Sequence, residues 1–512
     1  MPDHLNPPTF PIGQVNLTCT HLRAAASRQI VPELSAPVLQ HLRISRQVVD
    51  DILRDNIPAY GVTTGVGSQK NHSVGADTVA DYNRRLIRGH GTRVPGGHWP
   101  PEIVRGALVV LLNSFAAGRS GISPELAQLI AEKTQAAAMP EIDTSGSVGA
   151  SDLVPLAQLA EWILNSPEAQ VASLPRAKEA LSLMNSNAFS LSAGAHCIED
   201  LRALMTAYSL AAATTMEGFR CNPDAISNEV NAAHCRPGQA AASARLRAHL
   251  AGSALWQPGA ARLLQDPLSF RNISQVQGAA EEVLERLTQV WDEELNSVND
   301  NPIVSCETGR AYSHGNMDTT RQTLALDTMR QAMAKLADVA GERIHKLQWP
   351  AFSGLPIGLA SEDSPIGGVQ FLNLGHIAAS TIAIVKIHAT PHLLDSVGQL
   401  ADGVEDTSGQ AMQAVQQLRR LISESWKVVA LEMAVAVWAI DRRGIAPVSL
   451  GQDVREIFGL IRPLLPIESE GHDVFDLGGV VDAVTTYCTV NTEPACAYAV
   501  DPLPVSHAAI PG

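Results

Sequence analysis

Aromatic side chains are scarce in this chain. Phe, Trp and Tyr together make up 4% of its 512 residues, although 45% of the residues are hydrophobic and only 17% are charged. A ratio of this kind is typical of a large protein with a buried core. Because aliphatic side chains must fill most of that core, and alanine and leucine are abundant, the composition favours helices over strands.

The chain also lacks a positive net charge, a long apolar run and any paired cysteine motif. Its formal net charge of −15 argues against a nucleic-acid partner. No uncharged apolar stretch reaches the roughly 18 residues of a membrane helix, and the N-terminus has no basic start followed by an apolar segment. The seven cysteines form no CxxC pair, as expected for reduced thiols. These absences predict a cytoplasmic protein that binds neither nucleic acid nor a membrane.

Metal-binding and nucleophile motifs are missing as well. The two histidines with the most suggestive spacing, His388 and His392, are separated by Pro391, which breaks the helical geometry that a zinc site needs. No HExxH motif occurs, and neither a GxSxG nucleophile nor a phosphate-binding loop is found. We therefore expect no metal ligands in this chain.

What is present falls into three parts. Residues 1–190 alternate short helical periods with glycine-rich loops, which indicate either backbone close to a ligand or ordinary surface turns: 60–71, 88–101 and 143–152. Residues 191–465 contain long amphipathic stretches, which predict a bundle of helices: 197–219, 274–298, 318–347 and 406–440. Residues 466–512 are typical of a small cap of helix and loops. We therefore predict an all-α fold with a long central helix bundle.

Eight short motifs occur in a fixed order: YGVTTGVG (60–67), RGHG (88–91), GSVGASDLVPLA (146–157), LMNSNA (183–188), QDPLSFR (265–271), NSVNDNPIV (296–304), HGNM (314–317) and EDTSGQAM (405–412). Together they resemble the histidine/phenylalanine ammonia-lyase superfamily over most of the chain, from Tyr60 to about Leu460. The resemblance implies an almost entirely helical homotetramer whose active sites are built by loops from three subunits.

In this register Tyr60 matches the catalytic base of the superfamily, which removes a proton from the carbon next to the amine-bearing one. A free phenol has a pKa of roughly 10, so we expect cationic neighbours or helix N-termini to lower the pKa of Tyr60. Arg271 matches the arginine that binds the substrate carboxylate, for which a guanidinium offers a planar two-point fit. Asn185 and Gln265 match polar residues that line the same pocket.

Three further matches concern the substrate side chain. His90 lies where the histidine-specific branch has an imidazole-contacting histidine, which favours an imidazole-bearing substrate. Lys386 and Glu405 match substrate-facing positions of the superfamily. Since Lys386 interrupts the apolar run STIAIVKIHA, we expect it to be a buried cation with a partner. Solvent exposure is the alternative for Lys386 and Glu405.

The motif that defines the superfamily lacks one residue here. Its members cyclise an Ala-Ser-Gly tripeptide into an electrophilic methylidene-imidazolone, whereas Ala150 and Ser151 of this chain run directly into Asp152. Cyclisation needs the tight backbone that glycine allows, and Asp152 adds a Cβ and a negative charge. We therefore expect no methylidene-imidazolone and no other cofactor.

Without this electrophile, the resemblance implies a substrate whose amine leaves unaided. A trimethylammonium group already carries its positive charge, departs as neutral trimethylamine and has no lone pair for an electrophile. Leu268 and Met317 stand where many members have aromatic residues, which leaves room for three methyl groups. Among members of the superfamily, the chain looks most like the ergothionases, which eliminate trimethylamine from ergothioneine, the betaine of a thioimidazole amino acid, to give thiourocanate.

Three alternatives stay open. The chain could be a conventional histidine or aromatic amino acid ammonia-lyase or aminomutase that uses Ala150, Ser151 and Asp152 as a nonstandard tripeptide. Hercynine, which lacks the sulfur of ergothioneine, could be the trimethylamine donor. An inactive helical scaffold that binds a partner is the third, although such a protein has no need for Tyr60 and Arg271.

Overall fold

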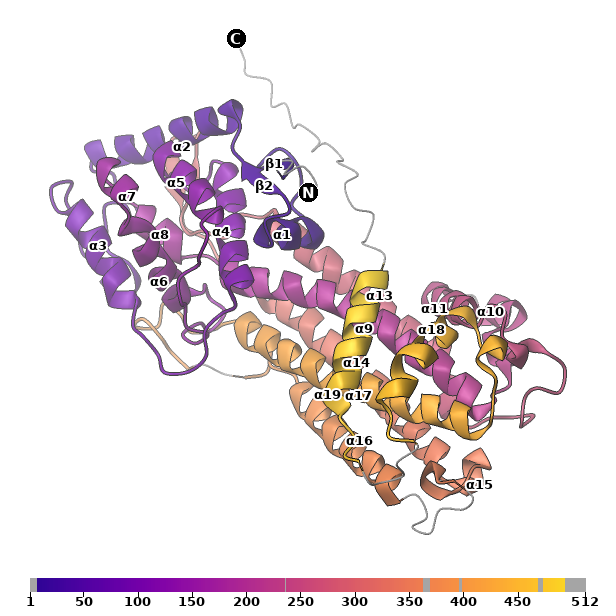
Figure 1. The fold of residues 1–512 in the computed structure, drawn as a ribbon. Helices are drawn as coiled ribbons and strands as arrows, with labels where there is room; N and C mark the ends of the chain where they lie inside the picture. Colours follow the sequence, from indigo (N-terminus) through magenta and orange to yellow (C-terminus); the bar gives the residue numbers. More distant parts are fainter. Residues whose placement is uncertain (1–6, 235, 362–368, 396–397, 468–472, 493–512) are drawn as a thin grey trace.

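The computed structural model describes residues 7–234, 236–361, 369–395, 398–467 and 473–492 of the chain. Helices dominate, as predicted, and the longest of them form a bundle (Figure 1). Its members are α9 (Ala188–Phe219), α13 (Ile273–Leu295), α14 (Thr320–Gln348), α16 (Val369–His388) and α17 (Ala411–Arg442). Helix α17 packs extensively against both α9 and α14.

Shorter helices cover both ends of this bundle. The N-terminal part holds α1 (Cys19–Ala26), α2 (Ala36–Arg54), α3 (Val79–His90), α4 (Pro101–Ala116), α5 (Pro124–Thr134), α6 (Leu153–Leu164), α7 (Pro167–Val171) and α8 (Glu179–Met184). Further along the chain come α10 (Asn228–His234), α11 (Pro237–His249), α12 (Leu268–Arg271), α15 (Pro350–Ser353), α18 (Gln452–Ile461) and α19 (Leu477–Asn491). Of these, α19 packs against α9 and α17 of the bundle itself. Figure 1 shows α2–α8 gathered at one end of the molecule, with α10, α11, α15 and α18 towards the other.

Strands are confined to two small pairs among the described residues. Strand β1 (Thr9–Pro11) runs parallel to β2 (Val31–Glu33), and β3 (Ile303–Ser305) forms a hairpin with β4 (Arg310–Tyr312). One continuous hydrophobic core includes side chains of the N-terminal part, of the bundle and of α19. The domain boundaries at 190 and 465 therefore stay predictions. Within the described ranges, no helix combines the length and apolarity needed to cross a membrane.

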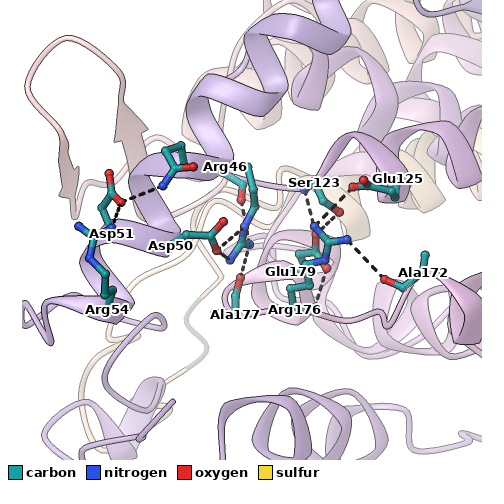
Figure 2. A network of polar contacts seen from close by, with 12 residues as sticks. Arg46, Asp50, Asp51, Arg54, Ser123, Glu125, Ala172, Arg176, Ala177 and Glu179 are labelled. Atoms are coloured by element: carbon teal, nitrogen blue, oxygen red, sulfur yellow. Dashed lines mark hydrogen bonds and ion pairs between the residues drawn. The ribbon is translucent and has the colours of Figure 1, made fainter. Parts of the chain in front are cut away.

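The segment that leads into α8 is fixed by a buried guanidinium and a buried carboxylate (Figure 2). Arg46 on α2 donates to the Ala177 carbonyl at 2.8 Å and, through Nε, to Asp50 at 2.9 Å. Glu179, the first residue of α8, accepts from the backbone N–H of Ser123 at 2.9 Å and from its hydroxyl at 2.6 Å. These bonds tie α8 to α2 and to the start of α5, so the residues that follow α8 begin from a rigid anchor.

The bundle itself contains a buried ion pair. Arg343 of α14 donates to Glu432 of α17 through Nε at 2.6 Å and through a terminal nitrogen at 2.9 Å. Thr215 of α9 donates its hydroxyl to the same carboxylate at 3.0 Å. Arg343 and Glu432 are 2% and 0% exposed. Because water does not reach either buried side chain, each depends on its protein partners. The bidentate pair together with the Thr215 hydroxyl therefore fixes the relative register of α14, α17 and α9.

Breaking this pair is expected to destabilise the fold. Arg343→Met leaves the buried Glu432 carboxyl without its ionic partner, which is expected to lower the free energy of unfolding by about 3–5 kcal/mol. Lys335→Met on the same helix removes an exposed partner of Asp338 and changes it by less than about 1 kcal/mol. Urea unfolding at one fixed protein concentration measures both. Equal loss in the two variants would contradict the role given to Arg343.

Candidate active site

A cavity of about 990 Å³ lies where the N-terminal loops meet the end of the bundle. Its walls come from the loop at 60–72, from α3, from the turn at 149–153, from the end of α8 and from the loop at 400–409. Four of the residues predicted from the sequence line it together: Tyr60, His90, Asn185 and Glu405. The other three, Gln265, Arg271 and Lys386, do not.

Tyr60 is held by the loop that it opens. Its phenol oxygen accepts a hydrogen bond from the Gly67 N–H at 2.9 Å, and Gly67 adopts a φ of +56° that favours glycine. Burial raises the pKa of Tyr60 above its ordinary value; the Gly67 N–H opposes this rise, and the charge of Glu405 adds to it. The expected lowering of the pKa of Tyr60 by cationic neighbours is thus wrong for a single copy of the chain.

His90 and Glu405 both line the cavity, close enough for their charges to interact. The Nδ1 atom of His90 lies 2.8 Å from the Leu86 carbonyl oxygen. Since a carbonyl can only accept, this contact places the ring proton on Nδ1 and leaves Nε2 as an acceptor in the neutral ring. Burial raises the pKa of Glu405, and the nearby His90 opposes that rise. The pair therefore offers one acceptor nitrogen and one carboxylate to a ligand with N–H groups.

Asn185, directly after α8, has a fixed amide. Its Oδ1 accepts from the Ser151 hydroxyl at 2.6 Å, and its Nδ2 donates to the Asn301 carbonyl at 2.9 Å. Ser151 in turn holds a φ of +81°, which is uncommon for any residue with a side chain. The amide orientation is therefore set by the protein, and one Nδ2 hydrogen remains for a ligand.

Asp152 points away from the cavity into the protein. It is 0% exposed, and its carboxylate accepts from the Ser147 hydroxyl at 2.8 Å and from the backbone N–H and hydroxyl of Ser190 at 2.8 and 3.0 Å. Its own N–H donates to the Ser186 carbonyl at 2.7 Å. Burial raises the pKa of Asp152 to about 6, against these hydrogen bonds. Both the backbone and the side chain of Asp152 are thus committed to the scaffold.

This arrangement does not fit a methylidene-imidazolone. To close that ring, the nitrogen of Asp152 has to turn from Ser186 and attack the carbonyl carbon of Ala150. The Asp152 side chain would have to follow, although three hydrogen bonds hold it, and its carbonyl also accepts the N–H of Leu156 in the first turn of α6. The residue directly before Asp152 is Ser151, so the glycine whose nitrogen closes the ring in other members is absent from the turn. The residues present therefore do not match the group that the superfamily builds.

Arg271 and Gln265 lie at the opposite end of α9. The cavity contains Asn185, two residues before the N-cap of this helix, whereas the segment before Arg271 is bound to the C-terminal end. There the Arg220 carbonyl accepts from the Arg262 N–H at 3.0 Å, and Arg271 Nε donates to the Asp266 carbonyl at 2.7 Å. The 32 residues of α9 span about 48 Å at 1.5 Å per residue. Arg271 and Tyr60 of one chain therefore lie at opposite ends of this helix.

Lys386 is not the buried cation that the apolar run suggested. Its side chain is 53% exposed and its Nζ lies 2.7 Å from Asp338 of α14. The reason is that α16 presents Lys386 on an outward face, next to the exposed Ile384 and Ile387. The apolar run that predicted burial is thus in part a surface of the isolated chain.

Sequence reasoning missed Tyr82, which lines the cavity beside Tyr60. It precedes His90 on α3 by eight residues, a spacing that places two side chains on the same helix face. That spacing was the available signal. Among the described residues, no three His, Cys, Asp or Glu side chains gather in a way that could hold a metal ion.

Comparison with known proteins places this chain in a family. Residues 17–463 match the model of the aromatic amino acid lyases. A histidine ammonia-lyase of Anaeromyxobacter sp. is 31% identical over 89% of this chain and 94% of its own, and one of Stigmatella aurantiaca is 30% identical over 94% and 98%. The structure of the ergothioneine-degrading enzyme ergothionase from Treponema denticola, in complex with desmethyl-ergothioneine sulfonic acid, has a TM-score of 0.87 at 23% identity, covering 94% of this chain and all of that one.

The helical fold agrees with these similarities. The histidine ammonia-lyase of Trypanosoma cruzi has the same fold, with a TM-score of 0.81 at 24% identity, and covers 94% of this chain and 93% of its own. The chain therefore belongs to the aromatic amino acid lyase family and is a carbon–nitrogen lyase of the ammonia-lyase superfamily.

Proposed function

We propose that this lyase eliminates trimethylamine from ergothioneine to give thiourocanate, without an electrophilic cofactor. The observation that carries the proposal is the turn at Ala150, Ser151 and Asp152. It lines a cavity with a tyrosine, an imidazole and a carboxylate, yet its third residue is fully buried and bonded into the scaffold. A site of this kind suits a substrate whose nitrogen needs no activation.

The charges around the cavity support a cationic substrate. Of the described residues that line it, Asp318, Glu405 and Asp406 carry carboxylates, whereas Arg85 carries the one guanidinium. Such a wall attracts a positive group. A trimethylammonium keeps its charge at every pH and loses it only when the carbon–nitrogen bond breaks, so the attraction persists until the amine leaves.

The ring of the substrate would be held by His90 and Glu405. With Nδ1 bound to the Leu86 carbonyl, the His90 Nε2 accepts one ring N–H, and the Glu405 carboxylate accepts the other. This pattern suits a thioimidazole, which carries two N–H groups in its thione form. The fold is similar to that of ergothionase, and this similarity is the reason for proposing ergothioneine, the sulfur-bearing compound, as the substrate.

Elimination needs one proton transfer and one bond cleavage. The Tyr60 phenolate takes the proton from the carbon next to the ring, and the electron pair of that C–H bond forms the new double bond. The carbon–nitrogen bond breaks with its electrons passing to nitrogen, and neutral trimethylamine departs. The Gly67 N–H, 2.9 Å from the Tyr60 oxygen, stabilises the phenolate before the transfer.

A second and a third copy of the chain would complete the site. Because α9 separates Arg271 and Gln265 from Tyr60 by its whole length, these residues serve a neighbouring copy's cavity in the proposed homotetramer. Arg271 would bind the substrate carboxylate there. Lys386, on its exposed face of α16, would reach the sulfur of a substrate in another copy's cavity.

The direct test is incubation with ergothioneine. We expect release of trimethylamine and the appearance of a conjugated ultraviolet chromophore, from a protein whose intact mass equals that of the unmodified chain. Ammonia from histidine, together with a mass two waters lower, would contradict the proposal and establish a conventional ammonia-lyase. Hercynine is assayed in parallel. If it is turned over faster than ergothioneine, hercynine is the preferred substrate and the proposal of ergothioneine is contradicted.

Shared sites predict complementation between two inactive variants. Tyr60→Phe is expected to lower kcat by about 10²- to 10⁴-fold because the base is lost, and Arg271→Met should be similarly poor because the carboxylate is no longer bound. Subunits unfolded together and reassembled at equal amounts should regain about a quarter of the wild-type activity, since random assortment leaves that share of sites intact.

No subunit in the mixture carries both Tyr60 and Arg271, so regained activity requires that one site combine residues of two copies. Absence of regained activity would therefore contradict shared sites. The same scheme with Lys386→Met in place of Arg271→Met tests Lys386. That variant should lose more activity on ergothioneine than on hercynine, and equal loss on the two substrates would contradict its contact with sulfur.

The pH profile should report the charge of Glu405. Tyr60 acts as a phenolate and burial raises its pKa, so kcat/KM is expected to increase with pH above neutrality. Glu405→Gln removes a negative charge that raises the same pKa, so the rising limb should move to lower pH although turnover falls. Glu456→Gln, on α18, removes a carboxylate outside the cavity and should leave the limb in place. A limb that stays fixed in Glu405→Gln would contradict this coupling.

A further inference from the structure

Two phenols are bound by two consecutive peptide groups at the cavity wall. The Val66 N–H donates to the Tyr82 oxygen at 3.1 Å, and the Gly67 N–H donates to the Tyr60 oxygen at 2.9 Å. Val66 and Gly67 belong to the loop that Tyr60 opens, whereas Tyr82 belongs to α3. Two phenols from different elements, the loop and α3, thus accept hydrogen bonds from the consecutive residues Val66 and Gly67.

We infer that Tyr82 is a positioning residue for the base. By accepting the Val66 N–H, its phenol oxygen orients the following peptide group so that the Gly67 N–H points at the Tyr60 oxygen. The peptide plane that contains the Gly67 N–H is rigid, so its direction is set by the residue on either side. On one side Tyr82 fixes Val66. On the other, Gly67 holds its φ of +56°, with the Ala401 side chain 3.4 Å from where a Cβ would stand.

Helix α3 makes Tyr82 a firm anchor. The Tyr82 N–H donates to the Thr78 carbonyl at 2.9 Å, and its ring packs against a buried cluster that includes Val62 and Val79. Since α3 also carries His90, one rigid helix sets both the ring-binding histidine and the loop that holds the base. The distance between base and ring-binding group is thereby fixed through Tyr82.

The inference rests on the proposed role of Tyr60 as the base, and the electrostatics around Tyr60 decide what to measure. Tyr82 faces it from α3 and Glu405 from the loop at 400–409. Further charged or titratable groups on the cavity wall are His72, Arg85, His90, His314, Asp318 and Asp406. Within the part of the chain that the structure describes, the Gly67 N–H lowers the pKa of Tyr60 against burial and Glu405, so displacing this N–H is expected to raise that pKa.

The test is the ionisation of Tyr60 in Tyr82→Phe, followed by NMR of tyrosine labelled with ¹³C at Cζ. The chain has six tyrosines, so Tyr60→Phe assigns the signal. We expect the Tyr60 midpoint to move to higher pH in Tyr82→Phe and, independently, in Gly67→Ala, which strains the same peptide. Tyr312→Phe removes a hydroxyl bonded to Thr308, outside the cavity, and should leave the midpoint unchanged.

Turnover provides a second readout. In Tyr82→Phe, kcat should fall by about 3- to 10-fold, the size expected for one weakened hydrogen bond, while KM stays within about twofold. An unmoved Tyr60 midpoint in folded Tyr82→Phe overturns the inference. A moved midpoint with unchanged kcat supports the positioning role and instead contradicts Tyr60 as the base, so the two proposals fail separately.

Discussion

The straight course of α9 is the constraint on which the rest of the molecule depends. This helix packs against α4, α13 and α17, and its two ends carry different chemistry. Asn187 at the N-terminal end donates to the Met317 carbonyl and accepts from the Ser151 N–H beside the cavity, whereas Arg220 at the other end holds the segment before Arg271. Because this helix separates them by about 48 Å, Tyr60 and Arg271 of one chain, the proposed base and the proposed carboxylate clamp, lie in different places.

The sequence predicted the helical class and the cavity residues within reach of the N-terminal loops. Tyr60, His90, Asn185 and Glu405 line one cavity although 345 positions (405 − 60) separate the first from the last. They could be predicted because the order of the motifs matched that of a known superfamily. Periodicity alone placed the start of α9 at residue 197, yet it begins at Ala188. Its first turns are buried on every side, so they show no amphipathic pattern to read.

Two properties could not be predicted from residue types. The pKa of Tyr60 depends on how much water and which charges surround it, and the sequence does not tell that burial and Glu405 outweigh the Gly67 N–H. The exposure of Lys386 depends on which face of α16 the chain itself covers. An apolar run predicts that something packs there, and it does not distinguish the same chain from a neighbouring copy.

The buried carboxylate of Asp152 has a consequence for how such a site can change. Its hydrogen bonds to Ser147 and Ser190 and the N–H bond to Ser186 fix the chain on the far side of the shortened turn. A glycine inserted after Ser151 would lengthen a segment whose end cannot shift to receive it. Under the proposed function, regaining the tripeptide would therefore take this insertion together with changes around Ser147, Ser186 and Ser190, so the shortened turn would make loss of the electrophile hard to reverse.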